Sequence, residues 1–437
     1  MSATLRPPAL LARGRLRDLD DATLRRLLER GPAEEGDVAA QVSAILADVR
    51  VRGDAALREM AARFDRVHLD ALEVPRQRWT EAVDALDAGV RAALERAATN
   101  IRRFHRAQLP ADVVLEVEPG VRVTRTWTPL ERVGVYAPGG RAAYPSSVLM
   151  GVVPAKGAGV GEVIVCSPPG PTGLPPREVL AACALGGADR LFALGGAGAV
   201  AALAFGTESV PTVDAIVGPG NRWVTEAKRQ VAGRLLIDSP AGPSEVLVLA
   251  DDGADPRLAA HELLAQAEHD PDAACVLVTT SAKVADATEA ELARQLAEAP
   301  RADVCRQALA ASGALLVADS LADALDFANR YAPEHLSIMT SAASEVARKV
   351  RTAGTTFVGG AASVAFGDYM TGANHVLPTG GRARSFSGLS TMSYLRSFTI
   401  QEVTPSAARA MANDVEILAM AEGLPAHAAA VRARSAP

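Results

Sequence analysis

Adjacent acid and imidazole side chains at positions 334 and 335 offer the simplest proton-transfer chemistry in this sequence. Glu334 and His335 follow Pro333, which ends the preceding helix and fixes an extended lead-in to a strand. A carboxylate and an imidazole can together remove two different protons near neutral pH. The two residues are therefore a candidate acid–base pair, although glutamate–histidine pairs also occur on ordinary protein surfaces.

Three other pairs place an imidazole near a carboxylate or an amide oxygen. They are Gln266 and His269, Asp368 and His375, and Glu422 and His427. Imidazole nitrogens combined with such oxygens form the mixed ligand sets that hold zinc and related divalent ions. We therefore expect a metal-assisted site, while each pair taken alone also has an ordinary structural interpretation.

A helix is predicted over residues 255–269. Asp255 is a typical N-cap, and Pro256 is a typical first helical residue. His261 and Glu262 begin like a His-Glu-x-x-His zinc helix, but position 265 is alanine, so that motif fails. The glutamine and histidine at the end of this helix share a face, where a histidine can also simply interact with the helix dipole.

Glycine and proline interrupt the chain at three predicted strand ends, after Tyr136, at 218–221 and before Ser244. Glycine lets the backbone approach a ligand closely, and an aromatic ring at such a turn can stack on a flat ligand. Together the three breaks predict one crevice lined by strand ends, the usual ligand site of α/β proteins. Each break alone is also compatible with a plain turn.

Gly196 and Gly198 follow an apolar strand and begin a helix, as a dinucleotide-binding loop does. The acidic partner is misplaced, because Asp214 precedes its strand, whereas the ribose-binding acid belongs after one. These glycines therefore have two interpretations: contact with a nicotinamide cofactor, or tight packing of the helix on the sheet.

The pattern of apolar residues predicts an α/β protein with mostly parallel sheets. Residues 15 to about 110 have helical periodicity, and two blocks of strands alternating with Ala-rich helices follow. The predicted strands are Val133–Tyr136, Val163–Cys166, Leu191–Leu194, Ala215–Val217, Glu245–Leu249, Cys275–Thr279, Ala314–Val317, Leu336–Met339 and Thr355–Val358. From about residue 391 the chain is predicted to be a short helical tail.

The composition is that of an ordinary globular enzyme. Its 437 residues are 49% hydrophobic and 22% charged, and the net charge of −6 gives no sign of a nucleic-acid or anionic-membrane partner. The four cysteines have no Cys-x-x-Cys spacing and suit a reducing cytosol. The N-terminus has no apolar signal region, and no run of 18 apolar residues occurs, so we expect a cytoplasmic protein.

Six strings of residues, in order along the chain, resemble those of histidinol dehydrogenase. They are Gly-Pro-Gly-Asn (218–221), Ala-Gly-Pro-Ser-Glu-Val (241–246), Gln-Ala-Glu-His (266–269), Ala-Pro-Glu-His-Leu (332–336), Asn-His-Val-Leu-Pro-Thr (374–379) and Glu-Gly-Leu-x-Ala-His (422–427). The resemblance covers residues 30 to 433, and six ordered motifs are much more specific than any one of them.

The resemblance implies a zinc enzyme that oxidises L-histidinol to L-histidine, via histidinal, in two NAD-dependent steps at the end of histidine biosynthesis. It also implies a homodimer in which the tail of each subunit completes the partner's site. By resemblance, the zinc ligands are Gln266, His269, Asp368 and His427, and the catalytic pair is Glu334 and His335. The implied substrate contacts are Ser244, His375 and Glu422 together with the zinc ligands and His335, and the implied NAD contacts are Tyr136, Gly198 and Asn221.

The resemblance further implies two incomplete Rossmann-like α/β domains with small helical segments at both ends. The expected divisions are an N-terminal helical segment (1–30), a main domain with most zinc and catalytic residues (31–112 and 244–390), a second domain with the NAD contacts (113–243) and a C-terminal tail (391–437).

The chain departs from the family pattern at three places. The family usually has glutamine where this chain has Gly198, so the cofactor subsite differs there. Gly151 replaces an asparagine, and Ser393-Tyr394 replaces an Asp-Phe pair, but neither touches the implied zinc ligands. One alternative is a paralogue that uses the same machinery on another small polar alcohol, such as a sulfonated diol. A non-enzymatic member of the fold is a second alternative, but it would have no need of the complete ligand set and catalytic pair.

Overall fold

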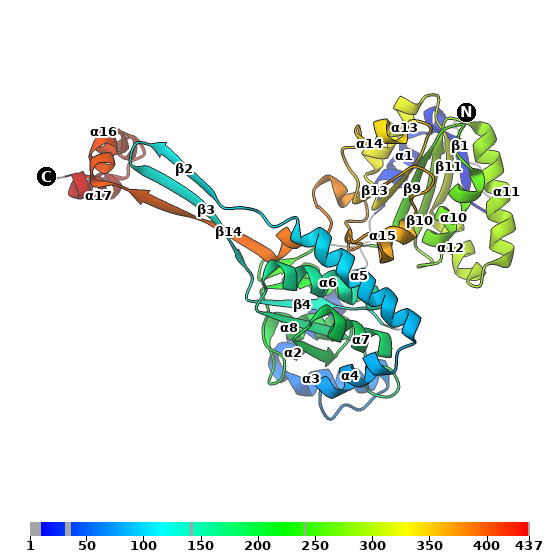
Figure 1. Ribbon diagram of the computed structural model, residues 1–437, viewed down its shortest axis with the longest axis horizontal. Coiled ribbons are helices and arrows are strands. Elements are labelled where there is room, and N and C mark those ends of the chain that lie inside the picture. Colours follow the sequence, from blue (N-terminus) through cyan, green and yellow to red (C-terminus); the bar gives the residue numbers. More distant parts are fainter. Residues whose placement is uncertain (1–9, 31–35, 140–142, 240–241, 436–437) are drawn as a thin grey trace.

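The computed structural model describes residues 10–30, 36–139, 143–239 and 242–435. The chain forms two α/β domains and a long arm that projects away from both of them (Figure 1). Each domain is built on a parallel sheet, as predicted, whereas the arm is built on an antiparallel one.

The first domain has a six-stranded parallel sheet in the order β1-β11-β10-β9-β12-β13. Its strands are β1 (Ala12–Arg15), β9 (Glu245–Ala250), β10 (Ala274–Thr279), β11 (Gly313–Val317), β12 (His335–Met339) and β13 (Thr355–Val358). One face packs on α10 (Pro256–Ala267), α11 (Ala282–Glu298), α12 (Ala302–Ser312) and α15 (Val364–Tyr369). The other face packs on α1 (Asp21–Leu28), α13 (Leu321–Tyr331) and α14 (Ala343–Ala347).

The second domain has a five-stranded parallel sheet in the order β6-β5-β4-β7-β8. Its strands are β4 (Arg132–Tyr136), β5 (Glu162–Ser167), β6 (Arg190–Ala193), β7 (Ala215–Val217) and β8 (Leu236–Ile237). Its helices are α2 (Gly36–Arg52), α3 (Asp54–Met60), α4 (Arg76–Asp84), α5 (Ala88–Arg106), α6 (Pro145–Ala158), α7 (Arg177–Gly186), α8 (Gly196–Phe205) and α9 (Arg222–Val231). One hydrophobic core joins the strands to these helices.

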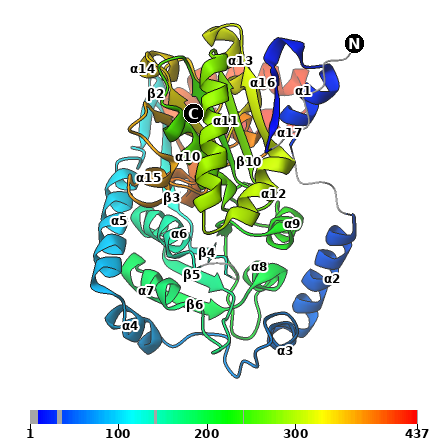
Figure 2. The same ribbon diagram turned by 90° about the vertical axis from the view of Figure 1, so that its right-hand side faces the viewer.

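The assignment of residues 31–112 to the main domain is corrected by this packing. Helices α2 to α5 lie against the second sheet, with α2 beside α8 and α9, α4 beside α7, and α5 beside α6 (Figure 2). Residues 11–28 belong instead to the first domain, where β1 adds an edge strand. Helical periodicity shows that a helix has an apolar face, but not which sheet covers that face.

The arm consists of β2 (Val113–Glu118), β3 (Val121–Pro129) and β14 (Leu395–Val403), followed by α16 (Pro405–Ala421) and α17 (Pro425–Ser435). The expectation of a purely helical tail from residue 391 is therefore wrong, since β14 pairs with β3 along its whole length. All six residues of β2 are exposed, although four of them are large apolar residues (Val113, Val114, Leu115 and Val117) that favour a strand.

All four cysteines are unpaired and buried, as expected of core residues. In the part of the chain that the structure describes, no helix is both long and apolar enough to cross a bilayer.

A buried ion pair holds the glycine-rich turn after β7. The Lys228 ammonium contacts the Asp238 carboxylate and donates to the Gly218 carbonyl at 3.0 Å. The other Asp238 oxygen accepts from the Gly218 N–H at 2.8 Å. Gly218 has a φ of +109°, and a Cβ there would lie 2.1 Å from the Tyr136 carbonyl oxygen, so only glycine fits.

Replacement of Lys228 by methionine is expected to lower the free energy of unfolding by about 3–5 kcal/mol, because it leaves a buried carboxylate without its partner. Arg229→Met is the matched control in the same helix, since Arg229 pairs with Glu226 at the surface. It is expected to cost less than about 1 kcal/mol. Urea unfolding of both variants measures the difference, and equal losses would contradict this role for Lys228.

Candidate active site

The predicted acid–base pair lies at the amino end of the first sheet. His335 is the first residue of β12, and Glu334 immediately precedes it. Glu245 is the first residue of β9, and the parallel register places His335 beside Val246. The two strands therefore start at the same edge. This arrangement differs from the usual α/β crevice, which lies at the carboxyl ends of the strands.

The imidazole of His335 is held in one tautomer. Its Nδ1–H donates to the Glu245 carbonyl at 2.9 Å, which leaves Nε2 as the unprotonated nitrogen. Nε2 is buried without a hydrogen-bond partner among the described residues and lies 3.9 Å from Asp368 Oδ1. Burial lowers the pKa of His335 to about 3, so the ring is neutral at physiological pH and Nε2 can accept a proton.

The carboxyl group of Glu334 lies in the same buried environment. Its Oε2 accepts from the Glu245 N–H at 2.7 Å and lies 3.5 Å from His335 Nδ1. Burial raises the pKa of Glu334 well above its usual value, and the neighbouring Glu245 and Asp368 carboxylates add to this effect. A positive charge beside Asp368 would therefore favour the ionised form of Glu334.

Three of the four expected zinc ligands lie in the same domain as this pair. Gln266 is on α10, which ends two residues earlier than predicted, so His269 follows the helix instead of closing it. Asp368 is on α15, which the Glu262 carboxylate of α10 holds by accepting from the Val364 N–H at 3.0 Å. The His269 ring lies close enough to His335 to lower its pKa further.

The side chains of Gln266 and Asp368 are suited to a cation. Both polar atoms of the Gln266 amide are buried without a hydrogen-bond partner in the described part of the chain. Burial raises the pKa of Asp368 to about 7, and the charge of Glu262 contributes. Among the described residues, no group of three or more histidine, cysteine, aspartate or glutamate side chains could hold a metal ion. The candidate ligand Gln266 is a glutamine and so does not count towards a group of these four residue types.

His375 joins the site to the second domain. Its Nδ1–H donates to the Asp368 carbonyl at 3.0 Å, and its Nε2 lies 3.4 Å from the Ser147 hydroxyl, in the first turn of α6. Ser244 is half-buried just before β9, and its carbonyl accepts from the Ala274 N–H. His375 therefore lies where the first domain contacts α6 of the second, whereas Ser244 lies immediately before β9.

The last two candidates lie elsewhere. Glu422 follows α16, and His427 is on α17, and both are exposed at the far end of the arm. Figure 1 shows these helices well away from both α/β domains. One chain therefore places six of the predicted metal, catalytic and substrate residues besides Ser244 in the first domain, but not these two.

The predicted cofactor residues follow strands of the second sheet. The Tyr136 hydroxyl, at the end of β4, accepts from the Gly196 N–H at 3.1 Å. Asn221 caps α9 by accepting from the Trp223 and Val224 N–H groups. Gly198 is buried within α8, where a Cβ would lie 3.1 Å from Met60 Sδ. Met60 lies on α3, so the close packing at this glycine is between two helices and not between the helix and the sheet.

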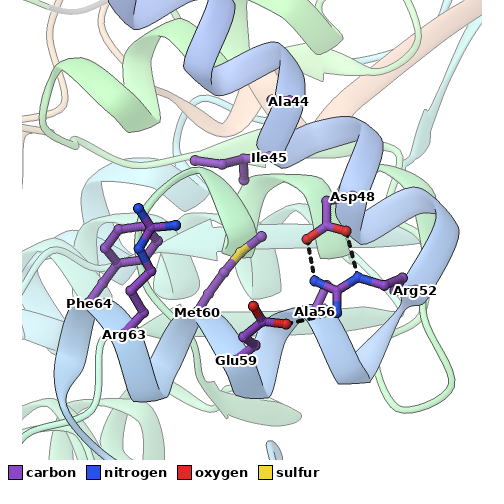
Figure 3. Close-up of a pocket in the computed structure, with 9 residues that line it drawn as sticks. All are labelled: Ala44, Ile45, Asp48, Arg52, Ala56, Glu59, Met60, Arg63 and Phe64. Atoms are coloured by element: carbon purple, nitrogen blue, oxygen red, sulfur yellow. Dashed lines mark hydrogen bonds and ion pairs between the residues drawn. The ribbon is translucent and has the colours of Figure 1, made fainter.

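A separate hollow of about 280 Å³ lies between α2 and the segment from α3 to residue 64 (Figure 3). It is lined by Ala44, Ile45, Asp48, Arg52, Ala56, Glu59, Met60, Arg63 and Phe64. Arg52 pairs there with Asp48 and Glu59. None of the predicted site residues lines this hollow, so its ion pairs are best explained as stabilising the helices.

Three residues of the site were not assigned a role from the sequence. Glu245 and Arg30 form a buried ion pair beside Glu334, and Glu262 holds α15. A charged residue at the start of an otherwise apolar strand was the available signal for Glu245. Glu262 lies one helical turn before Gln266, which was a weaker signal.

The family model for histidinol dehydrogenase matches residues 28–435. The chain belongs to the histidinol dehydrogenase family. The histidinol dehydrogenase of Methanosarcina mazei is 48% identical over 96% of this chain and 97% of its own length. That of Thermobifida fusca is 49% identical over 92% and 93%, respectively. A crystal structure of histidinol dehydrogenase from Elizabethkingia anophelis, 36% identical, superposes with a TM-score of 0.91 over 95% of this chain and 96% of that one.

Gln266→Met is expected to raise the free energy of unfolding of the metal-free protein by about 1–3 kcal/mol, because it removes a buried amide without partners while nearly conserving volume. The control is Gln295→Met, since Gln295 Nε2 donates to the Arg257 carbonyl at 3.2 Å and to Glu291 Oε2 at 3.4 Å, and only its Oε1 lacks a partner among the described residues. That variant is expected to lose stability. Unfolding in the presence of EDTA measures both, and a loss at Gln266 as large as that at Gln295 would show that the Gln266 amide is satisfied.

Proposed function

We propose that this protein oxidises L-histidinol to L-histidine, through histidinal, with zinc and two molecules of NAD. The proposal makes it the cytoplasmic enzyme of the last step of histidine biosynthesis. The observation that carries it is the Nε2 of His335, which is buried without a partner among the described residues and lies 3.9 Å from Asp368 Oδ1. The Gln266 amide, on the α10 helix that contacts α15, is likewise buried without partners. Membership of the histidinol dehydrogenase family supports the choice of substrate.

The residues on α10 and α15 fit a divalent cation. Gln266, His269 and Asp368 would provide two oxygens and a nitrogen, and His427 of a partner tail would provide the fourth ligand. Zinc, or manganese in the same ligand set, would supply a cationic anchor for the amine and imidazole nitrogens of the substrate. Its charge would also offset the Asp368 carboxylate and so lower the pKa of Glu334 towards the ionised form.

His335 and Glu334 would then divide the proton transfers. His335 Nε2 takes the hydroxyl proton of the alcohol, because Nδ1 is already committed to the Glu245 carbonyl. Glu334 activates the water that adds to the aldehyde, and His335 again serves as the base when the hydrate is oxidised. Such general-base contributions are typically about 10²–10⁴-fold each. Ser244, His375 and the partner's tail residue Glu422 would hold the polar groups of the substrate.

NAD would supply the hydride acceptor in both oxidations. Tyr136 and Asn221 support this assignment, because both lie where carboxyl ends of the second sheet face glycine-rich turns. Gly198 has no side chain that could contact the cofactor, and a Cβ at this position would lie 3.1 Å from Met60 Sδ. The paralogue acting on another small polar alcohol remains the second candidate, and this altered position is the observation in its favour.

A partner tail would complete each site. Glu422 and His427 are exposed on the arm, together with the large apolar residues Ile417, Leu418 and Met420. Exposed apolar groups of this size commonly mark a protein interface. We therefore propose a homodimer with twofold symmetry in which the tails are exchanged between subunits.

The purified protein is expected to form two NADH for each histidinol consumed, and a strong chelator is expected to abolish this activity. Zinc or manganese should restore it, since the ligand set suits either ion. Absorbance at the NADH band and chromatographic assay of histidine measure the ratio. A ratio near one would contradict the four-electron oxidation, and oxidation of other polar diols but not histidinol would favour the paralogue.

Two inactive variants, His427→Ala and Glu334→Gln, are expected to complement each other when they are unfolded together and refolded. If the tail acts in trans, half of the dimers are mixed and one of their two sites is intact, so about a quarter of wild-type activity should return. The control is each variant refolded alone. If mixed dimers form but no activity returns, the tail acts within its own chain.

A further inference from the structure

Glu245 is a buried carboxylate at the start of an otherwise apolar strand. Every residue of β9 is buried, and Glu245 is only 2% exposed. Removing a carboxylate from water is costly unless hydrogen bonds and an opposite charge compensate for it. The groups that bind the Glu245 carboxylate and its main chain therefore indicate what this residue does.

The main chain of Glu245 orients both members of the acid–base pair. Its N–H donates to Glu334 Oε2 at 2.7 Å, and its carbonyl accepts from His335 Nδ1–H at 2.9 Å. One residue thus sets the direction of the Glu334 carboxyl group and the tautomer of His335. A displacement of Glu245 would disturb both side chains together.

The side chain of Glu245 is fixed by Arg30 and by the loop after His375. Arg30 Nη2 lies 2.7 Å from Glu245 Oε2, and the two side chains are 13% and 3% exposed. The Gly380 N–H donates to the other carboxylate oxygen at 2.5 Å. The ion pair is therefore buried, and removal of its arginine would leave the Glu245 charge next to the Glu334 carboxyl group without a cation.

Arg30 also holds the chain that leads into the catalytic pair. Its guanidinium carbon lies 3.2 Å from the centroid of the Tyr331 ring, and Nη2 donates to the Tyr331 carbonyl at 2.9 Å. Ala332, the next residue, has a φ of +49°, a left-handed conformation that non-glycine residues rarely adopt. Such a conformation persists only where surrounding contacts enforce it. Arg30 therefore secures both sides of Glu334, through Glu245 and through Tyr331.

We propose that Arg30 and Glu245 are positioning residues for the reaction. Arg30 anchors the Glu245 carboxylate and the Tyr331 turn, and the main chain of Glu245 presents Glu334 and His335 to the substrate. This inference rests on the proposed function, because Glu334 and His335 are its acid–base pair. Neither positioning residue contacts the candidate metal ligands Gln266, His269 or Asp368 in any hydrogen bond or ion pair of the described residues.

The test compares Arg30→Gln with Arg15→Gln in the full-length, metal-loaded protein. Arg15 lies in the same N-terminal segment, but its ion pair with Asp319 is exposed. Arg30→Gln is expected to lower kcat about 10²-fold, the size of effect that a displacement of about 1 Å at a reacting group produces. KM for histidinol and the zinc content should stay near the wild-type values. Arg15→Gln should leave kcat unchanged.

Chemical rescue separates positioning from folding. In Arg30→Ala, guanidinium chloride at concentrations below those that unfold the protein should restore part of the lost kcat. If the variant is inactive because it is unfolded, added guanidinium chloride should lower its activity further. If Arg30→Gln does not fold, Arg30→Lys carries the test, since it keeps the charge but loses the planar stacking on Tyr331. It should fold with a kcat below that of the wild type.

Two outcomes remain distinct. The positioning role would be overturned if folded Arg30→Gln had the kcat of the wild type. If the glutamine variant does not fold, the same result in folded Arg30→Lys would overturn it. Either result would leave the proposed function standing. Failure of the wild-type protein to oxidise histidinol would overturn the proposed function itself.

Discussion

The parallel pairing of β9 with β12 is the interaction on which the site depends. It aligns the first residues of two strands, so that one peptide donor and one peptide acceptor of Glu245 meet Glu334 and His335. A shift of one residue in this register would turn the imidazole to the opposite face of the sheet. Both faces of the sheet are covered by apolar cores, so a shifted strand would exchange the side chains that are buried in each core. The relative positions of Glu334 and His335 are therefore fixed by packing of the whole sheet.

The site also contains buried polar groups that the chain leaves without hydrogen-bond partners. The Gln266 amide and His335 Nε2 are buried without partners among the described residues, and Asp368 and Glu334 have raised pKa values. Elsewhere buried charges are compensated, as at Lys228 and Asp238. Unpaired buried atoms also occur outside the site, for example at Ser167 and Thr288. Their combination with carboxyl groups of raised pKa is what distinguishes the site and is typical of a place where a ligand provides the missing partners.

The sequence predicted the interior of the fold better than its periphery. Apolar runs such as Val163–Cys166 became central strands because burial on both faces leaves a continuous hydrophobic signal. The arm strand β2 was missed although Val113, Val114, Leu115 and Val117 favour a strand, and nothing in this apolar run shows that all of its residues are exposed. Ordered motifs indicated the candidate catalytic pair and three candidate metal ligands, all of which lie in the first domain. The role of Glu245 is carried by its main chain and by Arg30, 215 residues earlier, which is a tertiary relation that spacing does not contain.

The antiparallel arm has a consequence for synthesis of the protein. β14 pairs with β3 residue by residue, although Leu395 is made 266 residues after its partner Pro129. At the usual elongation rates of about 5–20 residues per second, the β2–β3 hairpin waits roughly 15–55 s on the ribosome with one edge unpaired. Unpaired edges and exposed valines invite association with other nascent chains. Chaperone protection of the arm during translation would therefore limit such association.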